Sequence, residues 1–369
     1  MVSPKYYDFN PDYAVPPGIT LLETLENIGM TQAELAERTG RPKKTINEII
    51  NGKSAITPET AIQLEMVLGV PATFWNNLER NYREKLAEEQ ERERLKESLS
   101  WLKCVPIRKM SELGWIKTYD DKIKQLQEVL NFFGVASVKA WEAVWKPFMS
   151  SPRICYRKSE AFESDPIATA AWIRKGEIEA QKMNCFSYDL NKFRNSLDYV
   201  KTLTNDKPKD FISKMKLACA EAGVAVVFVP ELPKCRVNGI TRWLSPEKAI
   251  IQLSLRYRSD DHLWFTFFHE AGHILYHRKK DIFLEVKGES NGHEDQAKQF
   301  AAEFLVPSSA LKRFLREYVI SEGTVRTFAE SLGIAPGIVV GRLQFEGTLP
   351  FNSNLNKMKR RFEWASPTD

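Results

Sequence analysis

All five histidines of the 369-residue chain lie between residues 262 and 293. Within this window, residues 269–273 read His-Glu-Ala-Gly-His, which is the HExxH pattern. On a helix, a spacing of four residues puts both imidazoles on one face about 6 Å apart, so one zinc ion can contact a nitrogen of each at about 2.0–2.1 Å. Zinc polarises a carbonyl and lowers the pKa of a water towards about 7, and Glu270 can accept the proton. The pattern predicts a hydrolytic Zn2+ site with His269 and His273 as ligands and Glu270 as general base.

A catalytic zinc site needs a third protein ligand and one open position. His277 follows the motif on the same helix face, but eight residues from His269 correspond to about 12 Å along a helix, too far for one ion. Tyr276 and Lys279 occupy the positions where metzincin peptidases carry glycine and histidine, which excludes that class. The third ligand is therefore expected on another element.

A second predicted helix, residues 294–306, supplies an acidic side chain at its start. Glu294, Ala297, Ala301 and Leu305 form one stripe of this helix, and the two alanines allow a close approach to the small pair Ala271 and Gly272 of the motif helix. Glu303 lies about half a turn away from that stripe and is expected to face elsewhere. We expect Glu294 to be the third ligand. The competing ligands, or supports behind the ligands, are His293 and Asp295.

Other residues around the motif leave alternatives open. The side chains that could stabilise an oxyanion are Arg256, Tyr257, Tyr276, His277 and Arg342. If the strand over residues 249–255 lies at a sheet edge, an extended peptide could pair with it and present a carbonyl to the metal. As a thiolate, Cys235 could mask the zinc, although a lone loop cysteine is usually inert. The structural alternative is that the histidines bind no metal and that Glu294 only complements a helix dipole.

Residues 18–83 have the pattern of five short helices. Thr31 and Glu34 form a capping box at the start of one of them, and Gly40 ends it. Pro42 then opens the next helix. A capped helix, a glycine turn and a second helix are the organisation of a helix-turn-helix, so we expect this segment to bind DNA.

The predicted recognition helix carries most of the side chains that would touch DNA. Gln32, at the start of the preceding helix, would lie over a phosphate. The expected major-groove residues are Lys43, Lys44, Thr45 and Asn47, and the expected backbone contacts are Asn51 and Lys53. Residues 1–80 contain seven basic and ten acidic residues, so this basic spot on an acidic segment is a directed patch. The alternative is a small helical interaction module whose lysines are solvated.

The rest of the chain is expected to be helical first and mixed later. Residues 82–96 form a charged connector helix, and residues 100–220 are mostly helical with an aromatic core. Three short strands then precede the HExxH helix. The predicted fold is a multidomain, mainly α protein with an all-α helix-turn-helix domain, a helical middle region and an α+β zincin-like domain whose small sheet packs on the HExxH helix. The expected bounds are 1–83, 84–205 and 206–369.

Composition excludes several classes of protein. The chain is 43% hydrophobic and 27% charged, as in ordinary soluble globular proteins, and no apolar run approaches the length of a membrane span. Its first residues lack the apolar stretch of a secretory signal. The five cysteines are an odd number without a CxxC pair, which favours reduced thiols and a cytoplasmic location. A net charge of +5 is too small to indicate nucleic-acid binding by itself.

Two stretches resemble known families. Residues 17–83 closely resemble the HigA-type antitoxin helix-turn-helix of the Xre superfamily, which implies DNA binding and often a dimer. The motifs FHEAGHILYH and EDQAKQFAAEFLVP, with the later PGIVVGRLQ, resemble the ImmA/IrrE family of zinc metallopeptidases. This resemblance implies a cytosolic peptidase whose members cleave Xre-type repressors to switch on stress or mobile-element genes. It also implies that His269, His273 and Glu294 are ligands and that Glu270 is the base. The chain has LVP where the family usually has LMP.

These observations predict a DNA-binding regulatory zinc metalloendopeptidase that cleaves a transcriptional repressor or a similar regulatory protein. The resemblance to antitoxins connects it with toxin-antitoxin systems and stress responses. The alternative is a non-proteolytic, antitoxin-like transcription regulator whose HExxH domain senses metal or a signal. Partners would be operator DNA and the protein substrate, with a homodimer also expected and no membrane involved.

Overall fold

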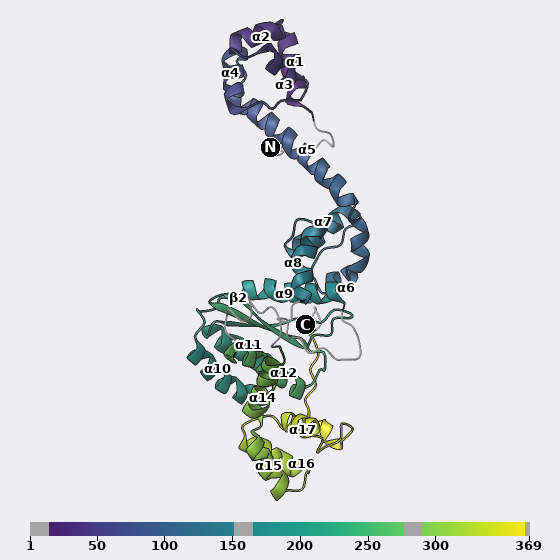
Figure 1. Ribbon diagram of the computed structural model, residues 1–369, viewed down its shortest axis with the longest axis vertical. Coiled ribbons are helices and arrows are strands. Elements are labelled where there is room, and N and C mark those ends of the chain that lie inside the picture. Colours follow the sequence, from purple (N-terminus) through teal and green to yellow (C-terminus); the bar gives the residue numbers. More distant parts are fainter. Residues whose placement is uncertain (1–14, 151–164, 277–289, 366–369) are drawn as a thin grey trace, which may run out of the picture. The chain divides into compact units, whose positions relative to one another are not determined.

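The computed structural model describes residues 15–150, 165–276 and 290–365. The chain divides into two compact units, Met1–Leu99 and Ser100–Asp369. Figure 1 shows that helices dominate both units and that the second contains the small sheet. These two units are separated by a single boundary, whereas the sequence predicts three domains. The division into three domains stays a prediction.

The N-terminal unit is a bundle of five helices. They are α1 Pro17–Ile28, α2 Gln32–Thr39, α3 Lys43–Ile50, α4 Pro58–Leu68 and α5 Ala72–Lys96. Leu21, Leu35, Ile46 and Trp75 are fully buried in their shared core. A Cβ atom added to Gly18 would lie 2.2 Å from the carbonyl oxygen of Ile49, so only glycine lets α1 and α3 approach this closely.

The second unit begins with short helices that share an aromatic core. They are η1 Leu99–Cys104, α6 Ile107–Glu112, α7 Lys122–Phe133, α8 Val138–Ser150 and α9 Pro166–Gln181. The centroid of the Phe133 ring lies 5.7 Å from the ring centroid of Trp141 and 5.7 Å from that of Trp145. The helical segment and its aromatic packing are as the sequence predicts.

Helix α9 packs on the sheet through two buried side chains. The Trp172 indole N–H donates to the carbonyl oxygen of Val229 at 3.0 Å, and the Gln252 amide donates to the carbonyl oxygen of Trp172 at 2.7 Å. A Cβ atom on Gly176 would overlap the Gln252 side chain. Helix α9, which falls within the predicted middle region, is thereby joined to the C-terminal sheet.

Two helices and three strands follow. They are α10 Leu190–Thr202, α11 Pro208–Glu221, β1 Val224–Phe228, β2 Gly239–Ser245 and β3 Lys248–Leu253, with the short η2 Leu203–Asn205 between the helices. The strand order is β1-β3-β2. Strand β3 pairs parallel with β1, Ile251 opposite Val226, and antiparallel with β2, Ile251 opposite Thr241. The strand expected over residues 249–255 is therefore central, so the conditional hypothesis that a peptide pairs with its free edge is wrong.

Further helices follow the sheet along the chain, and the first of them packs against it. They include α12 Asp260–Tyr276, α14 Ser290–Leu305, α15 Ser308–Glu317, α16 Glu322–Ser331, α17 Pro336–Phe345 and η3 Asn354–Met358. Helix α12 contacts β2 and β3 as well as α14 and α17. The predicted fold class is confirmed, including the small sheet on the HExxH helix. Within the described residues, every helix is too short or too polar to cross a bilayer.

Candidate functional site

Helix α12 holds the HExxH motif inside the core. Its first turn contains Asp260 and Asp261, whose negative charges are favourable at the positive end of a helix dipole. Trp264, Phe267 and Phe268 are fully buried and anchor the helix against its neighbours. A helix held on several sides keeps its histidines in fixed positions, which a metal site requires.

Helix α14 approaches α12 at the motif because both helices carry small residues there. A Cβ atom on Gly272 would lie 3.1 Å from the Cα atom of Ala297 and 3.1 Å from the ring of Phe300. Ala301, one turn further along α14, is also fully buried. The close approach that the sequence predicts is present, and it brings the start of α14 to the two histidines.

The structure brings together His269, His273 and Glu294. The Nε2 atoms of the two histidines lie 3.2 Å apart. Glu294 Oε2 lies 3.4 Å from His269 Nε2, and Glu294 Oε1 lies 3.2 Å from His273 Nε2. The histidines are 7% and 3% exposed, so the cluster is largely shielded from bulk water. Each of the three side chains offers one atom that can bind a metal, and among the described residues these three atoms all lie within 4.8 Å of one another.

These three side chains fit a zinc ion. Two ligands that bind one tetrahedral zinc at about 2.0–2.1 Å lie about 3.3–3.4 Å from each other, close to the separations observed here. Two histidines and one glutamate form a known donor set of catalytic zinc sites. Two effects on the pKa of Glu294 oppose each other. Burial raises it, whereas the hydrogen bonds with His269 and His273 lower it by a larger amount, so the pKa lies well below its usual range. Glu294 is therefore a carboxylate at neutral pH, as a metal ligand must be.

Glu270 lies beside the cluster and is buried away from solvent. Its side chain is 2% exposed, and its Oε2 atom has no hydrogen-bond partner among the described residues. The Thr241 hydroxyl donates to the main-chain oxygen of Glu270 at 3.1 Å. Burial raises the pKa of Glu270 well above its usual range. A buried carboxyl group beside the three converging side chains, with an oxygen free to bond, is placed to accept and return a proton.

Gly239, at the start of β2, provides the space for this carboxyl group. A Cβ atom on Gly239 would lie 2.6 Å from Thr266 Cγ2 and 3.0 Å from Glu270 Oε1. We expect Gly239→Ala to lower the free energy of unfolding by about 1–3 kcal/mol, because overpacking a filled site forces its neighbours to move. Urea denaturation measures the change. Gly292→Ala is the matched control, because a Cβ atom there meets nothing within 4 Å; equal losses in both variants would contradict this account.

The N-terminal unit has the local structure expected of a helix-turn-helix. The Thr31 hydroxyl accepts from the backbone N–H of Glu34 at 3.2 Å, and the Glu34 carboxylate accepts from the backbone N–H of Thr31 at 2.8 Å. Gly40 ends α2 with a left-handed φ of 65°. Pro42 is the N-cap of α3. The predicted capping box and glycine turn are thus both present and fix how α3 leaves α2.

The residues expected to contact DNA lie on or next to α2 and α3. Gln32 and Thr45 are half-buried, while the others are exposed: Lys43, Lys44, Asn47, Asn51 and Lys53. Lys44 lies 3.8 Å from Glu48 with 85% of its side chain exposed. The Asn51 amide donates to the Asn47 carbonyl oxygen at 2.7 Å. Ile46 and Ile49 on the opposite face are buried, so the polar face of α3 is the one available to a partner.

Comparison with known families matches both parts of the chain. A family model described as helix-turn-helix matches residues 21–75. A model described as IrrE N-terminal-like domain, of a peptidase family, matches residues 234–344, which include His269, His273 and Glu294. The chain joins a helix-turn-helix domain to an IrrE-like peptidase domain.

Individual relatives cover only part of the chain. Virulence-associated protein A of Dichelobacter nodosus is 37% identical over 68 residues, 18% of this chain and 67% of its own. The uncharacterized HTH-type transcriptional regulator YddM of Escherichia coli K12 is 33% identical over 63 residues, 17% of this chain and 67% of its own. A HigA-family addiction module antidote protein from Coxiella burnetii is 29% identical, covers 23% of this chain and 92% of its own, and has a TM-score of 0.22. An antidote protein of a plasmid maintenance system from Nostoc punctiforme has 30% identity with the same coverages and TM-score.

The other acidic and imidazole side chains considered as third ligands do not join the group. Asp295 is 78% exposed at its side chain and pairs with Lys298 at 3.7 Å. Glu303 hydrogen-bonds to the hydroxyl and the backbone N–H of Ser308 at the start of α15. His293 is half-buried and outside the converging group. His277 lies outside the described residues.

The candidates for oxyanion stabilisation have contacts of their own. Arg342 pairs with Glu346 at 2.9 Å, and Arg256 donates to the Arg236 carbonyl oxygen at 2.7 Å. Tyr257 stacks on the ring of His262 at 4.2 Å. Tyr276 packs on Phe300 at 5.6 Å. These contacts do not single out one of the four for the role.

Cys235 is an unsuitable ligand for masking a metal. It is buried, and burial raises the pKa of its thiol to about 11. In the part of the chain that the structure describes, Cys235 also lies outside the group of ligand-type side chains that converge on one point.

Two contributors to the site have only weak sequence signals. Gly239 and Thr241 begin a strand, and nothing in their local pattern indicates contact with a helix some thirty residues later. The usable signal is the glycine itself, because glycine within a strand often marks a close approach of another part of the chain.

Proposed function

We propose that this protein is a DNA-binding, regulatory zinc metalloendopeptidase. The observation that carries the proposal is the convergence of His269, His273 and Glu294 with the buried carboxyl group of Glu270 beside them. The match to an IrrE-like peptidase domain supports the same activity. The match to a helix-turn-helix domain supports DNA binding and transcription regulation.

In the proposed mechanism, His269, His273 and Glu294 would hold a zinc ion. When bound, zinc supplies Lewis acidity that polarises the scissile carbonyl and lowers the pKa of the attacking water. Glu270 takes the proton from that water on a carboxylate oxygen and returns it to the departing amine nitrogen. Thr241 holds the backbone of Glu270 through its hydroxyl, so the carboxyl group keeps its place during both transfers.

The proposed substrate is a transcriptional repressor of the Xre type or a similar regulatory protein. A helix-turn-helix domain on the same chain would place the peptidase at operators where such repressors are bound, which raises the effective concentration of substrate. A cytoplasmic location, a role in stress responses and a homodimer belong to the same proposal. They follow from the resemblance to the two families.

Co-expression with helix-turn-helix repressors encoded beside its gene tests this proposal. We expect a defined repressor fragment, identified by mass spectrometry, that appears in cells with the full-length protein and in a purified mixture with zinc. Removal of the metal by a chelator should stop its formation, and added zinc should restore it. A fragment that persists in the chelator would refute the metal-dependent activity.

A second candidate function has one observation in its favour. The histidines of the cluster are more than nine-tenths buried, so a peptide carbonyl reaches them only where the surrounding surface admits it. A regulator that binds metal or a signal without turnover would need no such access. If purified, zinc-loaded protein leaves every candidate repressor intact yet releases operator DNA when zinc is removed, the non-proteolytic function is the correct one.

For the DNA-binding domain, we expect Lys43→Ala combined with Lys44→Ala to weaken binding to a selected operator at least about tenfold. Both side chains are exposed on the polar face of α3, and a good base contact contributes about 1–3 kcal/mol. Fluorescence anisotropy with operators selected from random duplexes measures the affinity. The control is Lys207→Ala with Lys209→Ala, two exposed lysines of the other unit that remove the same charge. Equal losses in the two double variants would show a nonspecific charge effect.

A further inference from the structure

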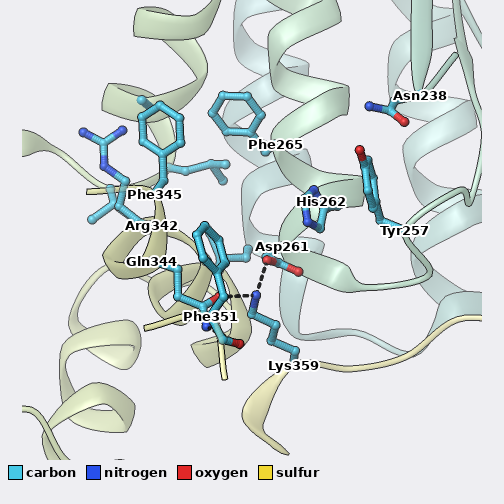
Figure 2. Close-up of a pocket in the computed structure, with 15 residues that line it drawn as sticks. Asn238, Tyr257, Asp261, His262, Phe265, Arg342, Gln344, Phe345, Phe351 and Lys359 are labelled. Carbon is cyan, nitrogen blue, oxygen red and sulfur yellow. Dashed lines mark hydrogen bonds and ion pairs between the residues drawn. The ribbon is translucent and has the colours of Figure 1, made fainter. Parts of the chain in front are cut away.

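A cavity of about 470 Å³ lies in the IrrE-like unit, and none of the three cluster residues lines it. Figure 2 shows side chains around it, and the lining comes from α12, α14 and α17, from the segments that precede β2 and α12, and from the segment that follows α17. Its apolar lining is contributed by Phe265, Leu305, Val306, Ile338, Phe345 and Phe351. Sites for small organic molecules usually measure about 300–1,000 Å³ and are mostly apolar with a few polar groups. This cavity has the size and lining of such a site.

One polar group of the lining is a buried ammonium group. The Lys359 side chain is 10% exposed. Its Nζ donates to Asp261 Oδ2 at 2.6 Å and to Gln344 Oε1 at 2.7 Å, drawn as dashed lines in Figure 2. An ammonium group has three N–H donors, and the described residues accept two of them. The third is available to an acceptor oxygen of a ligand.

The second polar group is the amide of Asn238. This side chain is buried, and its Oδ1 atom has no hydrogen-bond partner among the described residues. Leaving a buried polar atom without a partner costs about 1–3 kcal/mol, so a ligand that donates to it is favoured. Figure 2 shows Asn238 and Lys359 at two ends of the lining, with His262 between them.

Aromatic surfaces lie between these two polar groups. The rings of Tyr257 and His262 stack at 4.2 Å with an interplanar angle of 21°. Phe265 and Phe345 contribute further rings to the wall. Aromatic rings pack favourably against other aromatic rings. The lining therefore favours a flat, aromatic ligand over a flexible aliphatic one.

The charges of the lining cancel. Asp261 neutralises Lys359, and Glu346 neutralises Arg342 at 2.9 Å. An anionic ligand would gain the attraction of Lys359 but would also meet the carboxylate of Asp261. A neutral ligand loses less hydration energy when it is buried. We propose that this cavity binds a small, neutral aromatic compound with a hydrogen-bond acceptor at one end and a donor at the other.

Isothermal titration calorimetry on the full chain tests the chemistry with three matched probes. Indole-3-acetamide carries the ring, a neutral acceptor and N–H donors, 3-methylindole lacks the acceptor, and indole-3-acetate replaces the amide with an anion. We expect indole-3-acetamide to bind at least tenfold more tightly than either of the others. Equal affinity of 3-methylindole would overturn the role of Lys359, and tighter binding of the acetate would overturn the neutral class. No binding of any probe would overturn the site.

Substitutions then test the location. Ala302→Phe places a ring in the cavity from α14, and we expect it to weaken indole-3-acetamide at least tenfold. Ala310→Phe, at another half-buried alanine on α15, should leave the affinity within twofold. Should Ala302→Phe fail to fold by circular dichroism, Asn238→Ala removes only the unpartnered amide and should weaken the same probe several-fold. Unchanged binding in the folded variants would place the probe elsewhere and overturn the proposal.

Discussion

Glu270→Gln is expected to reduce cleavage of the repressor by a factor on the order of 10³ while leaving zinc bound, since general acid–base groups contribute about 10²–10⁴. Glutamine has nearly the size and shape of glutamate, and the Glu270 side chain is buried against Gly239. The substitution therefore leaves the packing against Gly239 intact and removes only the ability to accept a proton. A time course of fragment formation by purified protein, with zinc content measured on the same samples, gives both quantities.

The matched control is Glu317→Gln, which makes the same chemical change at an exposed helix residue of the same unit. Its rate should equal that of the unmodified protein. A Glu270→Gln variant that retains zinc and cleaves at the full rate would exclude Glu270 as the base. A variant that loses zinc would instead show that Glu270 supports the cluster, and the rate loss could not be assigned to proton transfer.

The parts of the site that sequence alone could predict are local. His269 and His273 are four residues apart on one helix, so their shared face follows from helix geometry without knowledge of the fold. The capping box of Thr31 and Glu34 is local in the same way, and it is present as expected. The position of Glu294 depends on a contact between two helices, but the small residues on both indicate that contact in advance.

The parts that sequence could not predict depend on pairings between distant segments. The central place of β3 is set by its pairing with β1 on one side and β2 on the other, and neither pairing leaves a signal in the strand itself. Lys359 reaches Asp261 from 98 residues away, so the polar end of the cavity is invisible in any local pattern. The charged segment predicted as a separate connector continues α5 without a break, because no proline or glycine interrupts residues 72–96.

Glu294→Gln is expected to weaken zinc binding more than about 100-fold, because substitutions behind metal ligands already cost about 10–100-fold. Glu294 approaches both histidines, whereas the neighbouring Asp295 is 78% exposed. Asp295→Asn is therefore the matched control, since both variants remove one negative charge near Lys298. Zinc affinity measured by competition with a chromophoric chelator should change less than about threefold in the control.

The pair of variants separates coordination from general electrostatics. If Glu294 only attracted the ion through its charge, the two variants would lose similar affinity. If it is a ligand, only Glu294→Gln loses it, and added zinc then raises the melting temperature of the control but not of Glu294→Gln, because an ion that binds only the folded state stabilises it by mass action. The reverse pattern, with zinc lost in Asp295→Asn and kept in Glu294→Gln, would identify Asp295 as the ligand and show that α14 presents a different side chain to the metal.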